Sequence, residues 1–372
     1  MKLVKTSYKS EDVIILLKDV TDNMKEMSTE EREKAIQSGV HYSEMLPEEK
    51  EPTKEYKELY NKALNNHAKD TALDIGRISE IIYNNTFKKN GKLPVIISLA
   101  RAGIPVGVLV KRYIKQFYNV DCNHYAISII RDRGIDINAM QYIFDEEIMG
   151  NNNDVENFIF IDGWTGKGAI KNQLNEAVEQ LKAIDTKWHS LKSDLYVVAD
   201  PANITSYCGT HSDYLLPSAC LNSTVSGLIS RTILNKYIDV ENGDFHGAYY
   251  FKKFENIDYT NDFIDRICKE FEKVEPSILG ISGEKGIDTV KRIGEHFGVD
   301  DYKKIKPGIG ETTRVLLRRV PWKVLLNINV SEKDADIQHI LELCKEKNVP
   351  IKRIDTNNYK VVGIIKDLSA DA

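Results

Sequence analysis

Hydrophobic and polar positions alternate in blocks along the middle of this 372-residue chain, and the alternation predicts strands separated by helices. Short, continuous apolar runs are typical of buried parallel strands, and each run here is followed by a segment with helical spacing. The runs lie at 94–99, 124–130, 158–161 and 194–199. This order predicts a doubly wound α/β domain, in which ligands bind at the carboxyl ends of the strands.

The segments on either side have patterns of their own. Near the N-terminus, Ser28 and Glu31 form a capping-box signal, and two further helices are predicted at about 53–67 and 70–87. After Pro276, a second alternation of strands and helices predicts a small α/β/α sandwich. We therefore predict an N-terminal helical segment packed on the core at 1–90, an α/β domain at 91–275 and a sandwich at 277–372.

Composition narrows the class of protein. No apolar run approaches the roughly 20 residues that a membrane span needs, and the N-terminus lacks the apolar core of a signal peptide. The five cysteines are scattered, without the paired spacing of a zinc site or a disulfide framework. We therefore expect a cytoplasmic protein with no membrane partner.

The strongest candidate for chemistry is the loop after the third strand. Its glycines let backbone N–H groups converge on a phosphate, and a predicted helix begins directly after it. A strand-end aspartate beside such a cradle suits a sugar hydroxyl or a Mg²⁺ ion. The predicted phosphate- and ribose-binding residues are Asp162, Gly163, Thr165, Gly166, Lys167 and Gly168, with Asp162 as the metal ligand. The plain alternative is a tight turn between a strand and a helix.

Two further loops follow the first and second strands, and together the three resemble type I phosphoribosyltransferases. Gly163 stands where that family usually has a second acid. The resemblance implies a pyrophosphate loop and a mobile catalytic loop, formed respectively by Arg101, Ala102 and Gly103 and by Arg131 and Arg133. It also implies that phosphoribosyl pyrophosphate, held with Mg²⁺, donates its phosphoribosyl group to a base.

A polar stretch further along could read that base acceptor, because hydroxyl and amide groups supply both donors and acceptors of hydrogen bonds. The predicted acceptor pocket comprises Ser218, Cys220, Asn222, Ser226, Arg231 and His246.

The C-terminal unit carries seven basic residues against one acid between positions 303 and 323, which indicates an anion-binding surface. Its glycine-rich loop and helix resemble the RNA-contact region of Pelota and ribosomal kink-turn-binding domains, with Gly310 in place of the usual asparagine. The predicted contacts to structured RNA are Lys306, Gly308, Gly310, Glu311, Arg314, Arg318 and Arg319. An accessory domain that forms a homodimer is the alternative.

Over nearly its whole length, the chain resembles a bacterial family associated with tellurite-type stress operons. The family is described both as a phosphoribosyltransferase–Pelota fusion and as cysteine protease StiP. The second description requires a thiolate near a histidine base. Cys220 is the preferred nucleophile, with His246 or His41 as the base, while Cys208 and His211 form a poorer pair. A nucleotide-sensing RNA-binding protein without catalysis is a third reading.

Overall fold

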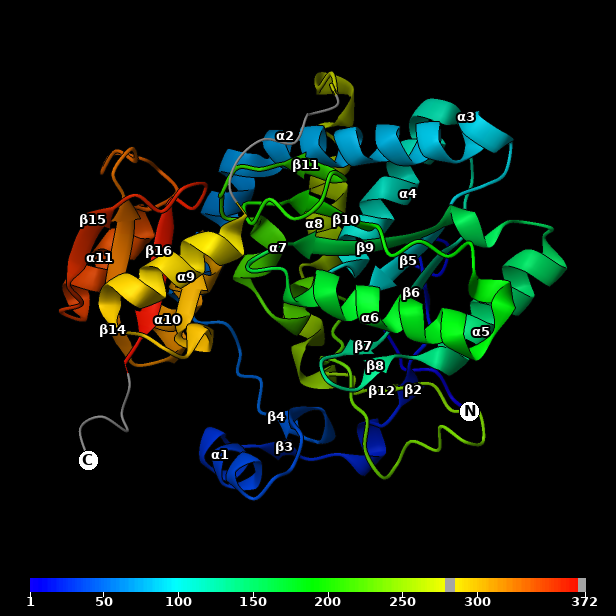
Figure 1. Cartoon of the computed structure of the whole chain (residues 1–372), viewed down its shortest axis with the longest axis horizontal. Coiled ribbons are helices and arrows are strands. Elements are labelled where there is room, and N and C mark those ends of the chain that lie inside the picture. Colours follow the sequence, from blue (N-terminus) through cyan, green and yellow to red (C-terminus); the bar gives the residue numbers. More distant parts are fainter. Residues whose placement is uncertain (278–284, 367–372) are drawn as a thin grey trace.

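A computed structural model describes residues 1–277 and 285–366, apart from the side chains of Thr29 and Arg318. Six parallel strands form its central sheet, in the order β1-β6-β5-β9-β10-β11 (Figure 1). Their bounds are β1 (Ile14–Ile15), β5 (Val95–Leu99), β6 (His124–Ile127), β9 (Phe158–Trp164), β10 (Leu195–Ala199) and β11 (Cys208–Thr210). The predicted mixed α/β architecture with a parallel sheet is confirmed.

Successive residues of a strand point to opposite faces of the sheet. Both faces of this sheet are apolar, and helices cover each of them. Ile159 and Ile161 of β9 pack into the same core as two long helices, whereas Phe158 and Phe160 pack into a second core on the other face. The first face is covered by α2 (Lys54–Asn85) and α4 (Ile104–Tyr118), and the second by α5 (Ile137–Phe144) and α6 (Ala169–Ile184) (Figure 1).

The N-terminal region differs from its prediction in one respect. Ser28 and Glu31 form the expected capping box at the start of α1 (Thr29–Gln37). However, α2 is one continuous helix of 32 residues where two helices were predicted. Ala68 and Lys69, which lie at the predicted break, are good helix formers, so nothing in the local sequence ends the helix there.

Short elements complete the first unit. Three two-stranded pairings lie outside the main sheet, and three small helices connect or flank the larger elements. The pairs are β2 (Lys18–Asp19) with β12 (Gly247–Ala248), β3 (Glu26–Met27) with β4 (Leu46–Pro47), and β7 (Ile129–Ile130) with β8 (Gly134–Ile135). The helices are α3 (Phe87–Asn90), α7 (Pro217–Cys220) and α8 (Thr260–Cys268).

The C-terminal unit has a four-stranded sheet in the order β13-β16-β14-β15, mostly antiparallel, with helices on both faces (Figure 1). Its strands are β13 (Ile305–Pro307), β14 (Pro321–Asn327), β15 (Ile351–Ile354) and β16 (Val361–Ile365). Its helices are α9 (Gly286–Phe297), α10 (Ile309–Arg318) and α11 (Gln338–Glu346). The elements match the predicted sandwich, although the apolar start predicted at 277–281 lies almost entirely outside the described residues.

The two units share one hydrophobic core. Ile309 and Leu316 of α10 and Ile340 of α11 belong to the same buried cluster as Tyr60 and Leu64 of α2. The C-terminal unit is therefore docked through apolar contacts as well as polar ones. Among the helices of residues 1–277 and 285–366, none combines the length and the apolar composition that crossing a bilayer requires.

Candidate active site

Two residues of the loop predicted to cradle a phosphate contact the C-terminal unit. The Nζ atom of Lys167 donates hydrogen bonds to the carbonyl oxygens of Tyr302, at 2.7 Å, and Ile305, at 3.0 Å. Desolvation lowers the pKa of this ammonium to about 8. The Gly166 carbonyl accepts a hydrogen bond of 2.6 Å from the Tyr359 hydroxyl. In this structure the loop after β9 holds the two units together.

The remaining groups of that loop are used within the first unit. Asp162 accepts a 2.7 Å hydrogen bond from the N–H of Gly163, and desolvation raises the pKa of its carboxyl to about 7. The Thr165 hydroxyl donates to the carboxylate of Asp200. Gly168 adopts a φ of +90° where α6 begins, a conformation that favours glycine. Magnesium at Asp162 stays a prediction.

The predicted pyrophosphate loop packs closely against β9. A side chain at Gly103 would place its Cβ 2.3 Å from the carbonyl oxygen of Ile161, so only glycine permits this approach. Arg101 extends the other way, donating to the Ile229 carbonyl at 2.7 Å and pairing with Glu49 at 2.8 Å. Ala102 also lies close to β9, because its carbonyl oxygen is 3.4 Å from the position that a Cβ on Gly163 would occupy.

The predicted mobile loop contacts the N-terminal segment. The N–H of Arg131 donates to the Tyr42 hydroxyl at 2.9 Å, and Arg133 forms an ion pair of 2.8 Å with Glu44. Arg131 also lines a hollow of about 280 Å³ together with Asp162 and Lys167. The strand-end residues are therefore brought near one another, as predicted, but the loop is tied down in this structure.

The preferred nucleophile and its predicted bases lie apart. The thiol of Cys220 hydrogen-bonds the Leu216 carbonyl at 3.9 Å, and burial raises its pKa to about 12. His41 and His246 each bond a serine hydroxyl instead, at 2.8 Å. Within the described part of the chain, no histidine hydrogen-bonds Cys220. This cysteine lines a cleft, but it lacks a base.

The rest of the predicted acceptor pocket separates in the same way. Asn222 and Arg231 line that cleft beside Cys220 and Arg101. His246 does not line it, and its backbone N–H donates to the carboxylate of Asp136. The other two members lie nearby in the chain, with Ser226 bonding the Asn222 carbonyl at 2.9 Å and Ser218 within α7.

The pair that sequence reasoning ranked lower brings a thiol and an imidazole together. Sγ of Cys208 lies 3.5 Å from Nε2 of His211, and Nδ1 of the same ring lies 3.0 Å from the Asp200 carbonyl oxygen and 3.6 Å from its carboxylate. A carbonyl oxygen only accepts, so Nδ1 carries the proton. Nε2 is then unprotonated, as a general base requires. Sγ also lies 3.9 Å from Nδ1, so the sulfur sits beside the ring, and the imidazole must turn to aim the Nε2 lone pair at the thiol.

The sheet explains why these three residues meet. Strand β10 pairs in parallel with β11, with Ala199 opposite Thr210, so the residues that follow them share one carboxyl edge. Asp200 and His211 are those residues. The N–H of Asp200 donates to the Thr210 carbonyl at 2.7 Å, which fixes the spacing between the two chains.

Asp200 is held rigidly at this edge. Its carboxylate is fully buried and accepts hydrogen bonds from the backbone N–H groups of Ile204, at 2.8 Å, and Thr205, at 3.0 Å, as well as from the Thr165 hydroxyl. Burial raises the pKa of Asp200, and these donors oppose the rise. Sequence analysis missed this residue, although an apolar strand that ends in aspartate was a visible signal.

The thiol itself is protected. Cys208 is 3% exposed, and burial raises its pKa to about 12, with a further rise from the carboxylates of Asp200 and Asp74. The resting cysteine is therefore a neutral thiol. Attack on a substrate requires His211 to take the proton as the bond to sulfur forms, as in serine hydrolases.

The same three side chains could also hold a metal ion, since their ligand atoms lie within 4.8 Å of one another. Thiolate and imidazole donors suit zinc or another soft transition metal better than magnesium. However, the Asp200 carboxylate already accepts three hydrogen bonds, which leaves it little capacity as a ligand.

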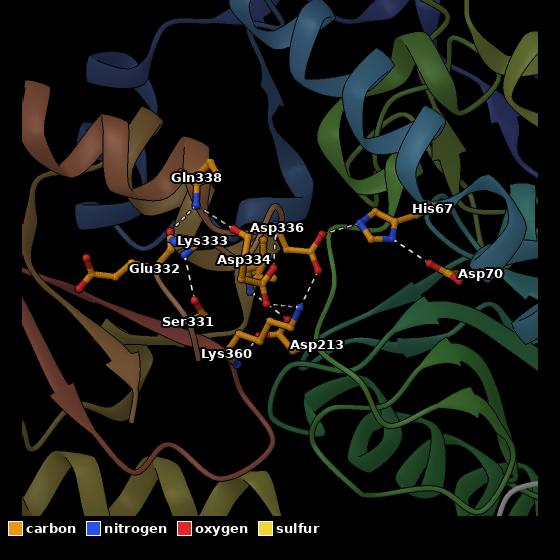
Figure 2. Close-up of polar contacts among 11 residues, drawn as sticks. His67, Asp70, Asp213, Ser331, Glu332, Lys333, Asp334, Asp336, Gln338 and Lys360 are labelled. Carbon is orange, nitrogen blue, oxygen red and sulfur yellow. Dashed lines mark hydrogen bonds and ion pairs between the residues drawn. The ribbon is translucent and has the colours of Figure 1, made fainter. Parts of the chain in front are cut away.

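A polar network joins the C-terminal unit to the edge that carries this pair (Figure 2). Asp213, two residues after His211, accepts hydrogen bonds from the backbone N–H groups of Ile309, at 3.0 Å, and Lys360, at 2.9 Å. Gly308, which precedes α10, has a φ of +90° and packs against Asp213. The loop predicted to contact RNA is thus partly used for docking.

A second set of contacts in the network involves α2. Lys360 pairs with Asp336 at 2.6 Å, and Asp336 in turn bonds Nε2 of His67 at 2.5 Å (Figure 2). Burial opposes the charge on His67, but its bonds to Asp336 and Asp70 outweigh burial and raise the pKa of the imidazole.

Comparison with known proteins decides the family. The family described as "Tellurite-like stress resistance cysteine protease StiP" matches residues 6–268, and the PELOTA RNA binding domain matches residues 284–367. The protein named cysteine protease StiP from Acinetobacter baylyi (strain ATCC 33305 / BD413 / ADP1) is 33% identical over 380 residues, which cover 97% of this chain and 94% of that protein. The chain belongs to the StiP family.

This membership overturns the phosphoribosyltransferase prediction. The StiP family and the Acinetobacter protein are both named as cysteine proteases, and neither match supports a transferase or the type I phosphoribosyltransferase fold. The physical reason for the error lies in the loops. Glycine-rich turns at strand ends were taken for a phosphate cradle, whereas Lys167 and Gly166 bind the C-terminal unit.

Proposed function

We propose that the chain is a cysteine peptidase in which Cys208 is the nucleophile, His211 the general base and Asp200 the group that orients the imidazole. The observation that carries the assignment is the 3.5 Å approach of Cys208 Sγ to His211 Nε2. The name of the family and of the Acinetobacter relative supports the reaction class.

The chemistry follows from the positions of these atoms. Nε2 of His211 accepts the thiol proton while sulfur forms a bond to the carbonyl carbon of a peptide. The carbon–nitrogen bond then breaks, and the amine leaves with the proton from His211. Water, deprotonated by the same imidazole, hydrolyses the thioester and restores the thiol. Asp200 stabilises the imidazolium that forms in both steps.

Selective alkylation tests the nucleophile. Iodoacetamide at neutral pH is expected to label Cys208 faster than Cys220, because only Cys208 has a neighbouring base. His211→Gln should slow labelling of Cys208 and leave the rate at Cys220 unchanged, as read by mass spectrometry of tryptic peptides. Labelling at Cys220 alone, with no dependence on His211, would contradict the assignment.

We also propose that the C-terminal unit binds RNA. The match to the PELOTA RNA binding domain over residues 284–367 supports this function, and the exposed Arg314 and Arg319 lie at its helix α10. Binding to a fluorescein-labelled RNA should weaken steeply as salt rises from 50 to 200 mM. Lys and Arg release the cations condensed on the phosphates when they bind, and this release becomes less favourable as the salt concentration rises. Affinity that is independent of salt would count against it.

A further inference from the structure

A cleft between the two units gathers residues that sequence analysis assigned to three separate sites. It encloses about 400 Å³, which is the size of a small-molecule site. Arg101 of the supposed pyrophosphate loop and Arg231 of the supposed acceptor pocket line one side, while Lys306, Arg314 and Arg319 of the C-terminal unit line the other. One acid, Glu311, is among its lining residues.

The charges in this cleft are incompletely neutralised. Arg314 pairs with Glu311 at 3.0 Å, and Arg101 with Glu49 at 2.8 Å. Within residues 1–277 and 285–366, neither Lys306 nor Arg319 forms an ion pair. A concentration of positive charge with low-dielectric walls attracts an anion.

Arg231 is the strongest indication that a ligand belongs here. Its Nε atom is buried and has no hydrogen-bond partner in the described structure, although buried donors are normally paired. Burial and the neighbouring Arg32 and Arg101 lower the pKa of its guanidinium to about 10. The ring of Tyr42 lies 5.2 Å from the guanidinium carbon and holds the side chain in place. An anionic oxygen in the cleft beside the guanidinium would relieve the repulsion, and the buried Nε would bond it after a shift of the side chain.

We infer that this cleft binds a single-stranded segment of RNA, so that the RNA surface extends from the C-terminal unit onto Arg101 and Arg231 of the first unit. The inference rests on the proposed RNA-binding function. A hollow between two units admits an extended strand but not the width of a duplex, and cationic grooves with aromatic and amide side chains are typical of single-strand sites. Tyr56 and Asn222 supply those two groups.

An adjoining hollow continues the cleft past Arg231. It encloses about 640 Å³, shares Arg101 and Arg231 with the cleft, and is bordered by four acids. They are Glu33, Glu48, Glu49 and Glu51. Five basic residues also line it and offset these acids, so a strand that enters from the side of α10 can continue past Arg231 into this hollow. They are Arg32, Lys50, Arg101, Arg231 and Arg319.

Fluorescence anisotropy of the full chain with a labelled 12-nucleotide single-stranded RNA tests the inference. Arg231→Gln and Arg314→Gln should each raise Kd about tenfold and reduce the slope of log Kd against log salt by about 0.7, the value for one phosphate contact. Arg231→Lys, which keeps the charge, should lose less. Arg266→Gln, on α8 outside the cleft, is the matched control and should leave Kd unchanged.

The outcomes separate this inference from the function on which it rests. A loss with Arg314→Gln but none with Arg231→Gln would overturn the cleft site and leave RNA binding by the C-terminal unit intact. No binding by the unaltered chain would overturn both. If a labelled acidic peptide binds the cleft and excess RNA does not displace it, the occupant is a peptide, and the inference is overturned as well. Circular dichroism of each variant establishes that it is folded.

Discussion

Cys208→Ala is expected to reduce peptidase activity about a thousandfold or more, because removing the nucleophile leaves only binding and the polarity of the site. The readout is release of fluorescence from a quenched casein substrate. The matched control is Cys220→Ala, which removes an equally buried thiol without a base and should retain activity. Activity that survives Cys208→Ala but is lost in Cys220→Ala would show that the wrong cysteine has been assigned.

His211→Gln and Asp200→Asn distinguish the roles within this site. The first removes the base and should lower kcat nearly as far as Cys208→Ala does. The second keeps the shape of Asp200 but weakens its hold on the imidazole, so a smaller loss is expected.

Treatment with a chelator distinguishes two roles for Cys208, a nucleophile and a metal ligand. The three side chains could hold a soft metal ion, and a metallopeptidase would also fail in Cys208→Ala. If Cys208 acts as a nucleophile, EDTA leaves activity unchanged and added zinc inhibits by binding the thiol. Activity lost in EDTA and restored by zinc would assign the cluster to metal binding instead.

The sequence was sufficient for four of the six strands of the central sheet and for the edge at which we place the chemistry, but not for β1 or for β11, which carries Cys208. The apolar runs at 94–99 and 158–161 became β5 and β9, and the loops after them lie beside one another as the parallel order predicts. It was insufficient for the role of each loop. Nothing local to Lys167 indicates that Tyr302 and Ile305, more than 130 residues away, supply its partners.

The choice between cysteines was beyond sequence reasoning for the same reason. Cys208 and His211 are three residues apart, a spacing that in an extended strand usually places side chains on opposite faces. The strand ends at Thr210, however, and the chain turns back so that the imidazole reaches the thiol. The pairing of β10 with β11, which brings Asp200 to His211, is a long-range contact that no short motif encodes.

Asp213→Ala is expected to loosen the C-terminal unit and lower the free energy of unfolding by about 2 to 5 kcal/mol, because one buried and one partly buried N–H group lose their acceptor. Asp213→Asn should cost less, since its amide oxygen can still accept from Ile309 or Lys360 but not from both. Urea unfolding measures these changes. Asp355→Ala, an exposed acid of the same unit, is the control and should have little effect.

The same variant tests whether docking controls access to the thiol. The C-terminal unit contacts both loops of the site: Asp213 follows His211, and the N–H of Gly286 bonds the Ala202 carbonyl at 2.7 Å just after Asp200. Cys208 is only 3% exposed, so part of its cover must open before a substrate reaches it, and we expect these contacts to be that part. Asp213→Ala should therefore speed alkylation of Cys208 while Asp355→Ala does not. An unchanged alkylation rate, together with the expected loss of stability, would show that the docked unit does not cover the site.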